Sequence, residues 1–144
     1  MKHARQVIRE AVATLLAGVG PAVYQSRVYP MVTLPVISIY ANAEEAESEN
    51  DTIGAPRRYT RDLTLQIDVV VDAVTGSDDL MDDYAAEIEA LMAADVTLGG
   101  VVTDTNLTRT TITLDGQSDT PIAKASLNYT VWYRTTGTDP ENAL

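Results

Sequence analysis

The sequence predicts an α+β fold, in which a mixed, mostly antiparallel β-sheet carries two helices packed on one face. Two windows have apolar residues at helical spacing, and five others have the composition or alternation of strands. Their order is helix, two strands, strand, helix, two strands. Each amphipathic helix has an apolar stripe to bury, and one apolar face of a sheet can cover both. We therefore expect residues 1–144 to form a single domain.

The first helix is expected over Lys2–Ala17, with His3 on the surface at its start. Its predicted buried stripe recurs at i, i+1, i+4 and i+5 and consists of Val7, Ile8, Ala11, Val12, Leu15 and Leu16. Gly18, Gly20 and Pro21 are expected to end it. Polar residues within this segment favour an amphipathic helix over a signal peptide.

Three strands are expected in the next part of the chain. Val23–Tyr29 and Leu34–Tyr40 form the first two, and Pro35 indicates that the second begins at an edge or a bulge. Tyr59–Asp72 is the clearest strand, because apolar residues alternate with polar ones along its length. That length predicts a ribbon that extends past the core.

Ala41–Arg58, between these strands, has the character of a long loop. It carries a run of carboxylates followed by Arg57 and Arg58, and it has no periodicity. Loops of this length are uncommon in compact domains and are usually functional or mobile. One interpretation is a solubilising surface loop. The other is a loop that is mobile in the free subunit and ordered by assembly.

The second helix is expected over Asp78–Ala94, with Ser77 as its N-cap. Its predicted buried stripe consists of Leu80, Tyr84, Ile88, Leu91 and Met92. Strands at Asn106–Leu114 and Ile122–Arg134 complete the sheet. The polar residues 136–144 are expected to form a frayed C-terminus.

Composition excludes several classes of function. A net charge of -11 argues against nonspecific binding of nucleic acids and of anionic membranes. The chain has no Cys and one His, so it cannot form disulfides or thiolate zinc sites and has little material for histidine-based catalysis. No apolar run reaches transmembrane length.

Two groups of carboxylates are the candidates for chemistry. The first, which could hold Mg²⁺ or Ca²⁺, consists of Asp78, Asp79, Asp82 and Asp83. The same residues suit the positive end of a helix dipole, so we favour a solvated helix start. Asp68 and Asp72 could form an acid–base pair, but we favour a solvated strand face because no His or Lys is near them in sequence. We therefore predict no catalytic, cofactor-binding or metal site.

The charged residues in and beside the predicted loop are the candidates for subunit assembly. Carboxylates come first along the chain and arginines follow, and these two side chains can pair in bidentate fashion between neighbouring subunits. The candidate residues are Glu44, Glu45, Glu47, Arg57, Arg58 and Arg61.

Several stretches resemble the minor tail protein U family, the tail terminators of lambda-like long-tailed phages and prophages. They read MKHARQVIREAV, LPVISIYANAEE, DLTLQIDVVVDA followed by SDDLMDDY, and LNYTVWYRT. The parts that match best are Met1–His3, Leu34–Tyr40 with Ala43 and Glu44, Leu63–Val70, Ser77–Leu80 and Leu127–Tyr133. The resemblance covers nearly the whole chain in the same order of elements.

The resemblance implies a non-enzymatic structural protein of the virion. Six subunits would close a homohexameric ring that caps the tail tube, stops its polymerisation and provides the surface for head–tail joining. The implied partners are further copies of the chain, the major tail tube protein and head–neck proteins. The implied location is the virion tail, and the host cytoplasm during assembly. No cofactor is implied, although a divalent cation could favour assembly by screening charge.

Three alternatives remain open at this point. A neck or head-closure subunit performs a similar task at the adjacent joint of the particle. A small metal-dependent cytosolic enzyme would use the carboxylates named above. A monomeric ligand-binding module would need neither assembly nor catalysis.

Overall fold

The computed structural model describes residues 2–25, 34–48, 57–73, 76–115 and 121–144. The elements are α1 (Ala4–Leu16), β1 (Ala22–Tyr24), β2 (Val36–Ser48), β3 (Arg58–Asp72), α2 (Ser77–Ala94), β4 (Asp104–Asp115) and β5 (Ile122–Thr136). Their order along the chain is the predicted order.

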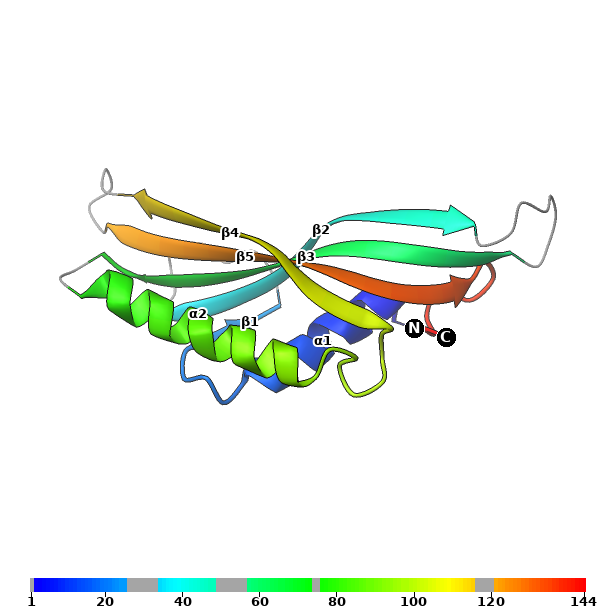
Figure 1. The fold of residues 1–144 in the computed structure, drawn as a ribbon, viewed down its shortest axis with the longest axis horizontal. Coiled ribbons are helices and arrows are strands. Elements are labelled where there is room, and N and C mark those ends of the chain that lie inside the picture. Colours follow the sequence, from blue (N-terminus) through cyan, green and yellow to red (C-terminus); the bar gives the residue numbers. More distant parts are fainter. Residues whose placement is uncertain (1, 26–33, 49–56, 74–75, 116–120) are drawn as a thin grey trace.

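The strands form one five-stranded sheet in the order β1-β2-β3-β5-β4. β1 is parallel to β2, and every other neighbouring pair is antiparallel. Both helices lie on the same side of the sheet, and the strands project past them at the end where β2 meets β3 (Figure 1). The predicted fold class, α+β with a mixed, mostly antiparallel sheet and helices on one face, is confirmed.

The core forms where alternating strands meet the two helices. β3 and β5 pair along their whole length, so their apolar residues form two neighbouring rows on the side of the helices. The rows consist of Leu63, Leu65, Ile67, Val69 and Val71, and of Ala123, Ala125, Leu127, Tyr129, Val131 and Tyr133. From α1 the core receives Ala4, Ile8, Val12 and Leu16. Removal of this aliphatic surface from water is the main favourable term in folding.

The buried stripe of α2 differs from the predicted one. The helix buries Met81, Ala85, Ile88 and Met92, whereas Leu80 is exposed. Both stripes have helical spacing, and docking on the sheet decides which one is covered. Ser77 is also not the N-cap: Gly76 takes this position with a left-handed φ of 85°, and Ser77 is the first helical residue.

The predicted loop over Ala41–Arg58 is wrong for most of its described part. β2 continues to Ser48, and its second half pairs with the beginning of β3. The acidic composition disfavours a strand, but the long partner strand supplies a hydrogen-bonding ladder that composition alone does not reveal. Residues 49–56 of the predicted loop lie outside the described residues.

The C-terminal residues contact the body of the protein, which differs from the frayed end we expected. The backbone N–H of Leu144 donates to the carbonyl of Arg134 at 2.7 Å, and Ala4 N–H donates to the carbonyl of Pro140 at 3.0 Å. The two termini therefore lie close together (Figure 1). Neither of the described helices combines the length and apolarity that a bilayer-spanning helix needs.

Candidate functional site

A group of polar residues lies on the helix-facing side of the sheet, beside the first turn of α1. Four elements contribute to it: Arg5 comes from α1, Glu44 from β2, Arg61 from β3, and Tyr133 and Thr135 from β5. We call these five residues the Glu44 cluster. Its side-chain hydrogen bonds and ion pairs join one helix to three strands.

A β-bulge in β2 turns Glu44 toward the helices. Ala41 pairs with Leu65 and Ala43 pairs with Thr64, so Asn42 is an extra residue between them. Since side chains alternate between the faces of a strand, one extra residue reverses the alternation. Glu44 therefore points to the same side as the core residue Ile39. Without the bulge it would have pointed to the opposite face.

Two arginines and a tyrosine bind the carboxylate of Glu44. Arg5 Nη1 lies 2.6 Å and Arg61 Nη1 lies 2.9 Å from Oε2 of Glu44. The Tyr133 hydroxyl donates to the other carboxylate oxygen, Oε1. Arg61 also donates from Nε to the Thr135 hydroxyl at 2.8 Å. The Glu44 side chain is only 9% exposed, so these donors replace nearly all of its hydration.

The surroundings of Glu44 shift the pKa values of two groups. Burial by itself raises the pKa of Glu44, but the hydrogen bonds from Tyr133, Arg61 and Arg5 outweigh it and bring the pKa below its usual 4.5. Burial, together with the hydrogen bond to Glu44, raises the pKa of Tyr133. Glu44 is thus held as a carboxylate and Tyr133 as a neutral hydroxyl.

His3 supports the cluster as the N-cap of α1, a structural role that the expected surface position did not include. Its Nδ1 accepts a hydrogen bond from the backbone N–H of Arg5 at 3.2 Å, and the backbone N–H of His3 donates to Gln6 Oε1 at 2.9 Å. This reciprocal capping box fixes the first turn of the helix. Burial, followed by the nearby Arg5 charge, lowers the pKa of His3. Neutral His3 keeps the lone pair that accepts from Arg5.

The geometry of the Glu44 cluster indicates a structural role, in which it links a helix to three strands. Its carboxylate is compensated by two guanidinium groups, so it offers no free base to a substrate. No group of three or more His, Asp or Glu residues in the described ranges could hold a metal ion. The predicted solvated start of α2 agrees with the structure, where Asp78, Asp79, Asp82 and Asp83 are all exposed.

A second polar network lies on the opposite face of the sheet, and it corrects the prediction for Asp68. This carboxylate is 6% exposed, although we expected a solvated strand face. It accepts hydrogen bonds from the Tyr40 hydroxyl at 2.7 Å and from Gln66 Nε2 at 2.8 Å. Asn42 in turn donates to Gln66 at 2.6 Å. Asp72 is exposed, as predicted.

The six assembly candidates fall into two groups in the structure. Glu44 and Arg61 bind each other within the subunit, and the sequence alone did not indicate this pairing. The other four are exposed: Glu45 and Glu47 on the second half of β2, and Arg57 and Arg58 where β3 begins. The carbonyl of Arg57 also accepts a hydrogen bond from the Gly137 N–H at 2.7 Å.

Comparison with known proteins finds likeness in solved structures only. No family model and no curated protein matches the chain. One similar chain belongs to a structure described as the virion of a native gene transfer agent particle. It has a TM-score of 0.56 and 15% identity, and the match covers 89% of this chain and 95% of that one. Another solved structure, which has no descriptive name, has a TM-score of 0.50 and 21% identity, with 88% and 92% covered. The chain shares its fold with both.

Proposed function

We propose that the protein is a structural component of a phage-like particle and acts as a tail terminator. In this role copies of the chain form a ring, most simply a hexamer, that caps the tail tube and stops its polymerisation. The other side of the ring would provide the surface for head–tail joining. The observation that carries the proposal is the fold shared with a chain from a gene transfer agent virion, over 89% of this chain and 95% of that one. The sequence resemblance to the minor tail protein U family supports the finer assignment.

Physical features of the chain are compatible with this role. The buried carboxylate of Glu44 is bound by two arginines of its own subunit, and exposed carboxylates and arginines lie on the second half of β2 and at the beginning of β3. A subunit of this kind contributes shape and contacts to an assembly. We propose that Glu45, Glu47, Arg57 and Arg58 contact neighbouring subunits or the tube, and that Glu44 and Arg61 shape this part of the sheet from within.

A neck or head-closure subunit is the second candidate. The shared fold favours it as much as it favours a terminator, because the similar chain comes from a structure of a whole virion. The two roles differ in what the protein binds. A terminator binds the end of a tail tube, and a head-closure subunit binds the portal side of a capsid.

The first experiment is imaging of the purified protein by negative-stain electron microscopy, together with analytical ultracentrifugation. Each subunit has a net charge of -11, so subunits repel one another and added salt or Mg²⁺ should strengthen assembly. We expect closed rings at high salt and high protein concentration. Rings would then be mixed separately with purified tail tubes and with capsids. Binding to capsids but not to tubes would favour the head-closure role, and monomers under every condition would refute both.

A further inference from the structure

β4 is an edge strand that carries two exposed apolar side chains on the side of the helices. In the described part of the chain β4 is the last strand of the sheet, and one side of it has no neighbouring strand there. Ile112 is 60% exposed and Leu114 is 71% exposed, the highest values among the large hydrophobic residues that the structure describes. The segment from Thr110 to Leu114 contains no charge and no proline. Proteins usually protect free edges with such residues, so an unprotected edge indicates a surface that becomes covered.

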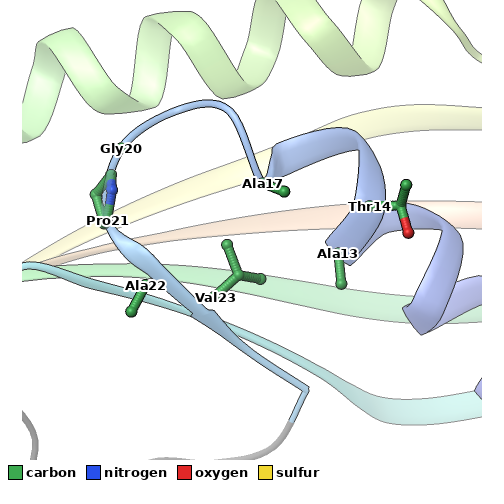
Figure 2. Close-up of a pocket in the computed structure, with 7 residues that line it drawn as sticks. All are labelled: Ala13, Thr14, Ala17, Gly20, Pro21, Ala22 and Val23. Atoms are coloured by element: carbon green, nitrogen blue, oxygen red, sulfur yellow. The ribbon is translucent and has the colours of Figure 1, made fainter.

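The opposite edge of the same molecule carries a shallow hollow that is lined by small side chains and by exposed backbone. It lies between the end of α1 and β1 and has a volume of about 480 Å³. Figure 2 shows Val23 of β1 on the side of the α1 residues that line it. The lining residues are small and uncharged: Ala13, Thr14, Ala17, Gly20, Pro21, Ala22 and Val23. Sites for small polar ligands usually offer several converging polar groups, whereas the side chains of this hollow offer one hydroxyl.

The register of the sheet places these two features at the same level. Direct partners across the five strands are, in order, Ile112, Ala125, Val69, Ile37 and Val23. Directly paired residues point to the same face of a sheet, so Ile112 and Val23 both point to the side of the helices. Ile112 and Val23, which lines the hollow, are therefore the two ends of one row of side chains.

We propose that Ile112 and Leu114 of one copy insert into the hollow of a second copy, with β4 lying beside β1. The strand directions agree with this contact, because β4 and β1 run in opposite directions within the sheet. A rotation about an axis parallel to the strands preserves each direction, so the new pair would be antiparallel, like most of the sheet. The contact joins two different surfaces of the chain, and a heterologous contact of this kind forms a closed ring if its rotation closes. The inference rests on the ring of the proposed function and identifies the residues that would form it.

Two single-surface variants test the contact. Ile112→Asp with Leu114→Asp removes the apolar pair and leaves the hollow, and Ala17→Trp fills the hollow from an exposed position and leaves the pair. Each variant alone should associate about 30-fold more weakly than the wild type, as for loss of an interface hot spot. The matched control is Leu80→Asp, which adds a charge at another exposed apolar residue. It should assemble like the wild type, and all variants should keep the melting temperature of the monomer.

Mixing the two variants shows whether the interface joins two different surfaces of the chain or two copies of the same surface. Each member of the mixture retains the surface that the other lacks, so sedimentation of a 1:1 mixture should show dimers and no larger species. A second measurement uses the absence of native cysteines: Ile112→Cys with Val23→Cys should give disulfide-linked multimers on oxidation, and neither single variant should. A mixture that remains monomeric, or disulfide dimers formed by Ile112→Cys alone, would overturn the contact. Rings that persist in both variants would overturn it but leave the terminator proposal intact. Dimers in the mixture, together with wild-type rings that fail to cap tubes, would support the contact and contradict the terminator proposal.

Discussion

Arg5 Nη1 lies 2.6 Å from Oε2 of Glu44, although the two residues are 39 positions apart in the chain. The ion pair joins the first turn of α1 to the half of β2 that projects beyond the bulge. Arg61 approaches the same oxygen from β3, so one carboxylate holds a helix and two strands together.

Glu44→Gln should destabilise the protein by about 1–3 kcal/mol, because the amide presents a donor to a site that already contains three donors. In a chain of this size each kcal/mol lowers the melting temperature by about 2–4 °C. The measurement is urea denaturation followed by circular dichroism. Glu47→Gln is the control, since Glu47 is exposed on the same strand and should have almost no effect. Equal stability of the two variants would contradict a structural role for the Glu44 cluster.

The contribution of Glu44 should depend on pH in one direction. Its pKa is lower in the folded chain than its usual 4.5, so folding favours the carboxylate. The stabilisation by Glu44 is complete at pH values above 4.5, and it is lost as the pH falls through the lower pKa of the folded state. The difference in unfolding free energy between wild type and Glu44→Gln should therefore shrink below pH 4.5. Denaturation curves at a series of pH values measure it, and a difference that is constant down to acid unfolding would argue against this titration.

Asp68 and Asp72 should respond differently to the same substitution. Asp68→Ala removes the acceptor for Tyr40 and Gln66 in a buried position, so we expect a loss of about 1–3 kcal/mol. Asp72→Ala changes an exposed residue and should remain within about 0.5 kcal/mol of the wild type. Thermal melts of the two variants provide the comparison. If neither variant changes the free energy of unfolding, the hydrogen bonds of Asp68 make no net contribution to stability. Assembly of the Asp72 variant should be normal.

Arg57→Glu combined with Arg58→Glu should affect assembly more than stability. Both side chains are exposed, and exposed charges contribute little to folding, so the melting temperature of the monomer should hardly change. Ring closure or tube capping should be impaired because the reversed charges meet carboxylates. Tail length in electron micrographs is the measurement, with uncontrolled lengths as the expected result. Normally capped tails would show that the assembly contacts lie elsewhere, for instance on β4.

Local patterns were enough to predict most of the elements. The alternation in β3 and β5 and the apolar stripe of α1 have periods set by backbone geometry, which a window of a few residues already contains. The order of these elements, with two amphipathic helices and one sheet, then restricts the architecture to two layers. No comparable local pattern marked the second half of β2, whose acidic residues suggested a loop.

The sequence by itself determined the α+β class, the order of helices and strands, and the rows of aliphatic residues that form the core. The tertiary structure decided which charged residues are buried. Asn42 forms a bulge only because β2 pairs with β3, and that bulge turns Glu44 toward partners from α1, β3 and β5. Burial of Asp68 likewise requires Tyr40 from another strand. The physical reason is that periodicity depends on neighbouring residues, whereas the cost of burying a charge is offset by donors that only the folded chain brings within hydrogen-bonding distance.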